Sequence, residues 1–264
     1  MSWKLSAFAD EIDGDIEVQF SHLKDSEISL VDLRSAYGKN VMLLSDDEAK
    51  SYTERAAEFG VAVNCIGSPI NKVVMAEATA EAELEKLTRA IELAGVVGTN
   101  RIRIFTPQGD DFDAVCAWME PQIEAAAKAN IVLMHENDAK YYGAYPEQAK
   151  KLVERFASPN FRFAFDFANT VQIGFKAMED WFPWLLPNLE TIHIKDARED
   201  GKVVPAGEGV GQVKETLVWL KEQGWDGVLS IEPHLQYAGD RGGFSGIESF
   251  QIATNAIKGI MASI

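Results

Sequence analysis

The sequence has few cysteines and few basic residues. Only Cys65 and Cys116 occur in 264 residues. Two cysteines are too few for a disulfide framework, so we predict reduced thiols in a cytoplasmic protein. Lysine and arginine total 25 against 41 aspartates and glutamates, which gives a formal net charge of −16. This deficit of positive charge argues against nucleic acid or an anionic membrane surface as a partner.

Sequences for targeting, membrane insertion and nucleotide binding are also missing. The N-terminus has no signal-peptide apolar region, and no apolar run approaches the length of a membrane span. Neither Gly-x-Gly-x-x-Gly nor a Walker sequence occurs, so we expect no nucleotide cofactor. No Pro/Gly/Ser-rich segment or charge block marks a linker. With 47% hydrophobic residues the chain can bury a large core, and we predict one domain over residues 1–264.

What is present is an alternation of strand and helix patterns. Apolar, β-branched runs predict eight strands, Lys4–Phe8, Ile28–Leu33, Val61–Gly67, Arg101–Thr106, Ile131–Glu136, Phe161–Phe167, Thr191–Lys195 and Val228–Glu232. Periodic segments predict eight helices, Asp15–Asp25, a stretch capped by Ser45 and ended by Gly60, Ala80–Val97, Asp113–Ala129, Pro146–Phe156, Phe175–Leu186, Gln212–Gln223 and Ile247–Met261. Because crossover helices join parallel strands, we predict a single (β/α)₈ TIM barrel, with an open doubly wound sheet as the alternative.

Four of these strands end on a carboxylate or an imidazole, namely Glu136, Asp166, His193 and Glu232. The carboxyl ends of barrel strands share one face of the molecule, where active sites lie. Three carboxylates and one imidazole suit Mn²⁺, Mg²⁺, Co²⁺ or Zn²⁺, and the missing thiolate disfavours a structural zinc site. We predict one divalent ion, with Mn²⁺ as the first choice. A strand-end ion pair would explain any one of the four, but not all of them. His135 should point away from Glu136 and pack or support it.

Other polar residues near the same strand ends are candidates for binding substrate: Arg34, Arg103, Asn169, Gln172 and Lys195. Lys195 shares a face with His193 and is the better pocket candidate. For the two arginines, a structural salt bridge is an equal alternative. Asn169 and Gln172 would hold substrate hydroxyls, or Asn169 would bond a carboxylate of the predicted metal site.

Two further segments have alternative interpretations. Gly207 and Gly209 predict a flexible loop over the site or an ordinary surface turn. Trp181, Phe182 and Trp184 predict core packing, or a contact in a homo-oligomer.

Seven short motifs together carry a family resemblance: Ser6-Ala7-Phe8-Ala9-Asp10-Glu11, Ile66-Gly67-Ser68-Pro69-Ile70, His135-Glu136-Asn137, Phe165-Asp166-Phe167-Ala168-Asn169, His193-Ile194-Lys195-Asp196, Pro205-Ala206-Gly207-Glu208-Gly209 and Ile231-Glu232-Pro233-His234. Over essentially its whole length the chain resembles the sugar phosphate isomerase/epimerase branch of the xylose isomerase-like TIM barrels. The resemblance implies one divalent metal held by Glu136, Asp166, His193 and Glu232. It also implies that the two glutamates serve as acid/base groups on opposite faces of a bound sugar.

Three positions depart from the ketose 3-epimerases of that family. Asn169 stands where they carry a substrate-binding histidine, and Tyr142 stands where they carry a further glutamate. The arginine expected shortly after the ligand histidine is assigned to Arg198, a further candidate for binding substrate, although the spacing does not fix this assignment. These departures leave the sugar and strict 3-epimerase activity open.

The predicted chemistry is proton removal beside a metal-chelated carbonyl, which passes through an enediolate. Return of the proton gives an epimer or an aldose–ketose isomer, and a leaving group β to the carbanion would make the same site a lyase or dehydratase. A metal-dependent endonuclease would need more histidines and a basic face, which this chain lacks. A catalytically silent sugar-binding barrel would not need both Glu136 and Glu232.

Overall fold

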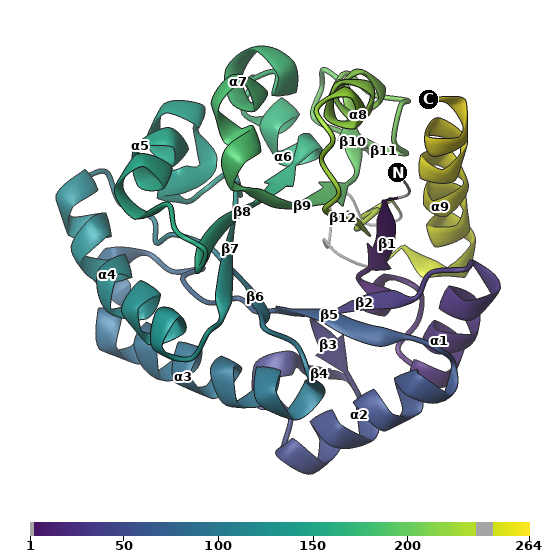
Figure 1. Cartoon of the computed structure of the whole chain (residues 1–264), viewed down its shortest axis with the longest axis horizontal. Coiled ribbons are helices and arrows are strands. Elements are labelled where there is room, and N and C mark those ends of the chain that lie inside the picture. The colour runs from purple at the N-terminus through teal and green to yellow at the C-terminus, as the bar shows by residue number, and fades with distance from the viewer. Residues whose placement is uncertain (1–2, 236–244) are drawn as a thin grey trace.

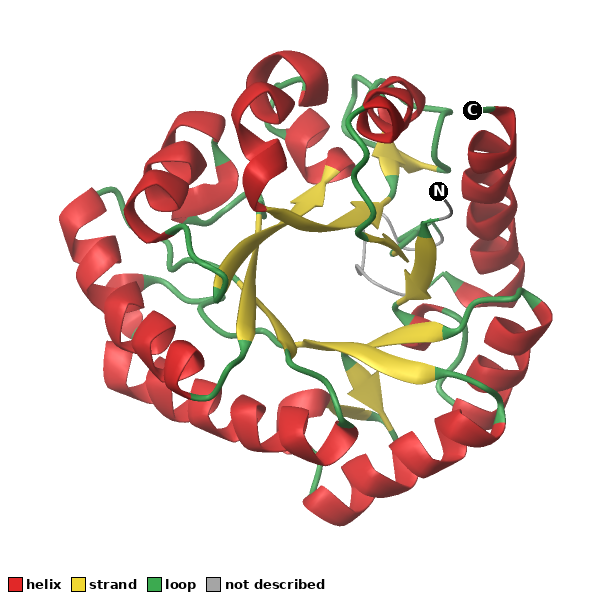
Figure 2. Cartoon of the chain, viewed as in Figure 1, coloured by secondary structure: helices red, strands yellow, loops and turns green. Residues whose placement is uncertain are grey.

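The computed structural model describes residues 3–235 and 245–264. Eight parallel strands form a ring inside a layer of helices (Figures 1 and 2). The strands are β1 (Lys4–Ala7), β2 (Leu30–Leu33), β5 (Ala62–Gly67), β6 (Arg101–Ile104), β7 (Val132–Glu136), β8 (Phe161–Asp166), β9 (Leu189–Ile194) and β12 (Val228–Ile231). Their hydrogen-bonded order is β1-β12-β9-β8-β7-β6-β5-β2. The predicted TIM barrel is confirmed, and the alternative of an open doubly wound sheet is wrong.

The strands β1 and β2 stand at the two ends of that order and lie side by side in the ring (Figure 1). A buried carboxylate links this seam. Asp32 of β2 accepts hydrogen bonds from Ser6 of β1 (3.0 Å), Asn64 of β5 (2.6 Å) and Ser230 of β12. Hydrogen bonds between side chains of four strands therefore close the barrel between β1 and β2, which are not paired by backbone hydrogen bonds.

The outer layer follows the predicted helical order. The helices are α1 (Ile16–Asp25), α2 (Asp46–Glu58), α3 (Ala80–Val97), α4 (Phe112–Lys128), α5 (Pro146–Phe156), α6 (Phe167–Gln172), α7 (Phe182–Leu185), α8 (Val213–Glu222) and α9 (Gly246–Ser263). Ser45 and Glu48 form the predicted capping box of α2. Pro121 lies inside α4, which continues through it.

Two predictions on the segment after β8 are wrong in detail. The strand ends at Asp166 rather than Phe167, because the carboxylate of Asp166 caps α6 by accepting the backbone N–H of Asn169 at 2.8 Å. The helix predicted over residues 175–186 is a π-helical turn, Ala177–Trp181, followed by the short α7. Trp181 and Phe182 are buried in the core, as predicted.

Two small hairpins lie at the carboxyl ends of the strands and were not predicted. They pair β3 (Ser35–Ala36) with β4 (Lys39–Asn40), and β10 (Asp196–Ala197) with β11 (Val203–Val204). Strands of two residues are too short to show a period of two, so no sequence pattern indicates them.

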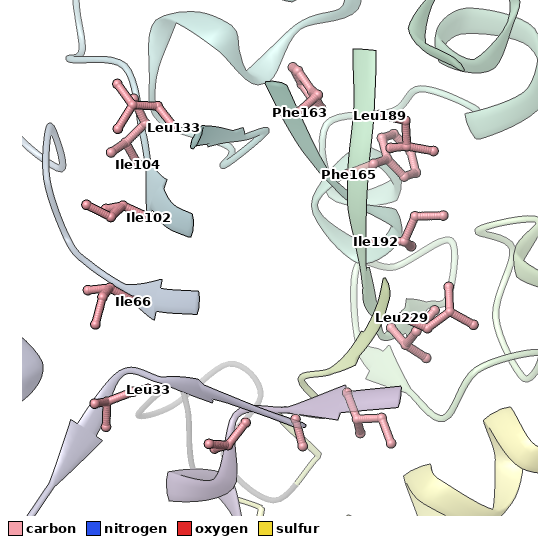
Figure 3. Close-up of a cluster of buried hydrophobic side chains, with 14 of the residues drawn as sticks. Leu33, Ile66, Ile102, Ile104, Leu133, Phe163, Phe165, Leu189, Ile192 and Leu229 are labelled. Atoms are coloured by element: carbon pink, nitrogen blue, oxygen red, sulfur yellow. The ribbon is translucent and has the colours of Figure 1, made fainter. Parts of the chain in front are cut away.

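Strand side chains alternate between the helices and the barrel interior. Those facing the helices form the large apolar core drawn in Figure 3, for example Leu133 and Phe163. The interior holds a small separate cluster of Cys65, Met134 and Ala164. Glu136 shares the interior face of β7 with Met134, whereas the ring of His135 faces outward and packs 5.0 Å from that of Phe163. Among the described residues, no helix is long and apolar enough to cross a membrane.

Candidate functional site

Four buried side chains converge at the carboxyl end of the barrel. Glu136, Asp166, His193 and Glu232 each offer one ligand atom, and these atoms all lie within 4.8 Å of one another. The Nδ1 atom of His193 is 3.4 Å from a carboxylate oxygen of Glu136, 3.4 Å from one of Glu232 and 4.0 Å from one of Asp166. Parallel pairing of β7, β8, β9 and β12 brings the four strand ends together.

The donor set fits a divalent cation. Nδ1 of His193 is buried and makes no hydrogen bond, although it faces two carboxylate oxygens. A cation among these atoms would satisfy the ring nitrogen and the three carboxylates together, and oxygen with imidazole ligands suits Mn²⁺, Mg²⁺ or Zn²⁺. This is the only such group of His, Cys, Asp and Glu side chains in the part of the chain that the structure describes.

The electrostatics of the cluster depend on opposed effects. Burial alone would raise the pKa of Glu136, but His193 and Arg103 outweigh it and hold the pKa well below its usual range. Burial likewise opposes ionisation of Glu232, but Lys195 and His234 outweigh it and hold its pKa low. Burial raises the pKa of Asp166 to about 6 although Lys195 opposes the shift. Both glutamates are therefore ionised at neutral pH.

Three cations surround the carboxylates. Nζ of Lys195 lies 2.9 Å from Asp166 and 3.1 Å from Glu232. Arg34 donates to Glu232 at 2.9 Å, and Arg103 donates to Glu136 at 3.0 Å. The two arginines thus form the salt bridges considered as an alternative, and they also line the pocket described next.

A pocket of about 250 Å³ opens at these strand ends, and we call it the mouth pocket. Its lining residues are Arg34, Lys72, Arg103, Glu136, Asp138, Asn169, Gln172, Lys195, Val203, Glu232 and His234. Nδ2 of Asn169 donates to Glu136 at 3.3 Å, and Gln172 donates to the carbonyl of Gly201 at 3.1 Å. The volume lies below the roughly 300–1,000 Å³ of pockets for drug-sized ligands, which favours a small single molecule.

Arg198 is the one candidate that the structure does not bring to the mouth pocket. It is exposed in the β10–β11 turn, where its backbone N–H donates to the carbonyl of Lys202 at 2.9 Å. A side chain in a polar turn carries no periodic signal of its direction, so spacing alone could not place it.

Sequence reasoning missed several residues that line or support the mouth pocket. Asp10 and Glu11 follow β1 and bind Arg34 at 2.8 Å each. Lys72 and Asp138 form an ion pair of 2.7 Å across the mouth. The polar ending of the first strand was a sequence signal for Asp10 and Glu11. No sequence pattern indicated the loop residues Lys72 and Asp138.

The Gly-rich segment after β11 is tied to Asp196. The carboxylate of Asp196 accepts the backbone N–H groups of Gly207 (3.0 Å), Gly209 (3.1 Å), Gly211 (2.8 Å) and Ala197 (2.8 Å). Neither predicted alternative, a flexible loop or an ordinary surface turn, included these hydrogen bonds to Asp196. It holds the loop beside the β10–β11 hairpin, whose Val203 lines the pocket.

A larger cavity, of about 600 Å³, lies at the opposite end of the barrel among the first residues of the strands. Arg101 and Glu190 pair there at 2.9 Å. No cluster of potential metal ligands lies among its described lining residues, and barrel chemistry belongs to the carboxyl ends of the strands. The mouth pocket is therefore the candidate active site.

Comparison with known families agrees with the barrel fold. A family model described as xylose isomerase-like TIM barrel matches residues 17–249. The chain belongs to the xylose isomerase-like TIM barrel family. No curated protein sequence matches it significantly.

Three solved structures of this barrel type illustrate the similarity. A D-tagatose 3-epimerase-like protein is 18% identical with a TM-score of 0.78, over 98% of this chain and 97% of that one. The probable 3-DHS dehydratase AsbF from Bacillus anthracis is 15% identical with a TM-score of 0.75, over 97% and 99%. A xylose isomerase-like TIM barrel protein from Mycobacterium smegmatis, in complex with magnesium, is 15% identical with a TM-score of 0.72, over 98% of each chain. At these identities the structures establish the shared fold.

Proposed function

We propose that this barrel is a divalent-metal-dependent isomerase or epimerase of a small sugar or sugar derivative. The observation that carries the proposal is the pair of buried, ionised glutamates on the two sides of His193. Glu136, Asp166, His193 and Glu232 would hold the metal, with Mn²⁺ as the first choice. When bound, a divalent ion polarises a carbonyl and stabilises the negative charge that develops on it.

The residues of the chain supply the proton chemistry. Each glutamate turns one oxygen toward the ligand cluster and the other toward an outer donor, Asn169 for Glu136 and Arg34 for Glu232. A lowered pKa keeps each group in its basic form. One glutamate removes the proton beside the carbonyl and becomes protonated. It returns that proton to the neighbouring carbon to give an isomer, or the other glutamate, after taking up a proton from solvent, delivers one to the opposite face to give an epimer. General base catalysis of this kind contributes about 10²–10⁴-fold to the rate.

Lys195 and Arg103 support the same step. Both are buried cations beside the carboxylates, so they favour negative charge on a substrate oxygen within the mouth pocket. Asn169 and Gln172 offer amides to substrate hydroxyls. A dehydratase remains the second candidate, because the same proton removal expels a leaving group on the next carbon, and the similar AsbF structure is named a probable 3-DHS dehydratase.

The test is solvent exchange. Protein loaded with Mn²⁺ is incubated in D₂O with D-tagatose, D-fructose or D-ribulose, and the sugar is followed by NMR. Epimerisation or isomerisation by proton transfer introduces deuterium at the reacting carbon, whereas a dehydratase yields a product that has lost a hydroxyl.

Matched variants assign the two glutamates. Glu136→Gln and Glu232→Gln should each lower the exchange rate by at least about 100-fold while keeping much of the metal. Glu190→Gln, at the far end of the barrel, is the control and should exchange like the parent. Exchange at the parent's rate in both site variants would show that another group is the base.

A further inference from the structure

An exposed ion pair stands at the outer edge of the mouth pocket. Nζ of Lys72, in the loop after β5, lies 2.7 Å from a carboxylate oxygen of Asp138, in the loop after β7. Their side chains are 38% and 23% exposed, whereas those of Glu136 and Glu232 are each 3% exposed. The two glutamates therefore lie at the floor of the pocket, and Lys72 and Asp138 form what we call the rim pair. An ion pair this exposed adds little to the stability of a fold.

Lys72 extends from a fixed backbone. Asn71, the residue before it, is fully buried and has a φ of 67°, in the left-handed region that asparagine tolerates. Its backbone N–H donates to Glu83 at 2.6 Å, its Nδ2 donates to the carbonyl of Phe105 at 3.0 Å, and its Oδ1 accepts from Trp118 at 3.0 Å. Nζ of Lys72 lies 4.2 Å from the centroid of the Phe105 ring, in a cation–π contact. The ammonium group is thus held in place before a ligand arrives, which lowers the entropic cost of binding.

Asp138 is tied to the strand that carries a candidate metal ligand. Its backbone N–H donates to the carbonyl of Glu136 at 3.1 Å, and its own carbonyl accepts from Tyr141 at 3.1 Å. Both members of the rim pair therefore have a defined position relative to the floor of the pocket.

The rim pair suits a hydroxyl group better than a phosphate. A hydroxyl both accepts and donates, so it can accept from the ammonium of Lys72 and donate to the carboxylate of Asp138 at once. Hydrogen bonds to charged groups are the stronger ones. A phosphate monoester is mostly dianionic at neutral pH and has almost no hydrogen to donate. At the same place it would face Asp138 as a like charge.

The other cations of the mouth pocket are also paired with carboxylates. Arg34 and Lys195 lie 2.9 and 3.1 Å from oxygens of Glu232. Arg103 lies 3.0 Å from an oxygen of Glu136. Each lysine or arginine on the described part of the lining is thus within 3.1 Å of a carboxylate, so none of them offers an unneutralised charge to a phosphate.

We propose that Lys72 and Asp138 bind the terminal hydroxyl of the substrate, at the end of the carbon chain away from the carbonyl, and so select sugars without a phosphate at that end. The inference rests on the proposed function, and it narrows the substrate class to unphosphorylated polyhydroxy carbonyl compounds. With the carbonyl at the floor beside Glu136 and Glu232, the carbon chain extends toward the rim. Lys72 donates to the hydroxyl oxygen, and Asp138 accepts its hydrogen.

Calorimetric titration with two ligands tests the selection. Mg²⁺-loaded protein should bind D-tagatose at least about 10-fold more tightly than D-tagatose 6-phosphate. Asp138→Asn replaces the carboxylate by an amide that can donate to phosphate, and it should lower that ratio by at least about 10-fold. Glu120→Gln is the matched control, because it removes the same charge from an exposed ion pair with Arg155 on the outer helices, and it should keep the parent's ratio. Equal or tighter binding of the phosphate by the parent, or an unchanged ratio in Asp138→Asn, would overturn the proposal.

A deoxy sugar tests the hydroxyl contact itself. 6-Deoxy-D-tagatose lacks the terminal hydroxyl, so the parent should bind it about 10-fold more weakly than D-tagatose. Lys72→Met should bind D-tagatose about 10-fold more weakly than the parent does, and it should distinguish the two sugars much less. Lys72→Arg keeps a charged donor and should recover part of the affinity. Equal discrimination of the two sugars by Lys72→Met and the parent would overturn the contact.

Two readouts separate this proposal from other roles and from the proposed function. If Lys72→Met lowers Tm and leaves the affinity for D-tagatose unchanged, the rim pair is structural and the proposal is wrong. If the parent binds D-tagatose but introduces no deuterium from D₂O, the proposed function fails, while the titrations still decide the role of Lys72 and Asp138. Binding of neither D-tagatose nor its phosphate would overturn the proposal as well.

Discussion

His135 and Glu136 are neighbours on β7, yet their environments are opposite. Glu136 faces the barrel interior among His193 and Arg103, whereas His135 faces outward and packs against Phe163. Burial outweighs the attraction of the Glu136 carboxylate and lowers the pKa of His135 to about 4. One step along a strand therefore separates a carboxylate of the candidate metal site from a neutral packing histidine.

The shift at His135 predicts a pH-dependent stability. Its pKa is about 4 when folded and about 6.5 when unfolded, so the unfolded chain binds the proton first as the pH falls. The contribution of neutral His135 to the free energy of unfolding is fully present above pH 6.5. It is lost between pH 6.5 and 4, by about 3 kcal/mol in total. Urea unfolding of the parent and His135→Gln at pH 7 and pH 5 checks this. The parent should lose more stability than the variant over that interval, and equal losses would contradict the assignment.

The loop after β11 shows how a segment without regular structure becomes ordered. Asp196 accepts four backbone N–H groups, three of them from alternate glycines. The backbone can approach the Asp196 carboxylate this closely because these positions are glycines. A Cβ at Gly209 would fall against the carbonyl oxygen of Ala197 and the carboxylate of Asp196, and one at Gly211 would lie 2.6 Å from Asp196. The repeated glycine serves contact with a carboxylate rather than flexibility.

A glycine pair tests this interpretation of the loop. Gly209→Ala should destabilise the protein by about 1–3 kcal/mol because the added methyl group has no space. Gly95→Ala lies in α3, where the new methyl group would meet no atom within 4 Å, and should be neutral or stabilise by up to about 1 kcal/mol. Thermal unfolding measures both. A Gly209→Ala protein as stable as Gly95→Ala would show that the loop adapts without cost.

Across the whole barrel, the candidate metal site ties β7, β8, β9 and β12 together at one end, while Asp32 links β1, β2, β5 and β12 across the seam. The three ligand carboxylates repel one another unless cations lie between them. A bound divalent ion would add a cross-link among four strands that exists only in the folded chain, so ion binding and folding are coupled.

This coupling predicts that metal raises thermal stability. At about 100 times its dissociation constant, an ion stabilises the fold by about 2.7 kcal/mol, which raises Tm by about 5–10 °C in a protein of this size. Unfolding is compared in EDTA and in increasing Mn²⁺ or Mg²⁺. His193→Ala is the matched variant and should lose the rise together with bound metal in elemental analysis. A rise in Tm equal to the parent's in that variant would exclude His193 as a ligand.

Local pattern by itself determined the barrel and the candidate ligands. Strand and helix periods depend on near neighbours, and each polar ending adjoins its own apolar run, so Glu136, Asp166, His193 and Glu232 are visible one at a time. Parallel order then requires their strand ends to share a face.

Tertiary structure alone decided which polar residues meet. Arg34 reaches Asp10, Glu11 and Glu232 from distant parts of the chain, and His234 reaches Glu11 across most of its length. The direction of a side chain in a loop has no period, and a contact between remote residues depends on packing of the whole ring. For that physical reason Arg198 is exposed while Asp10, Glu11 and His234 support the site.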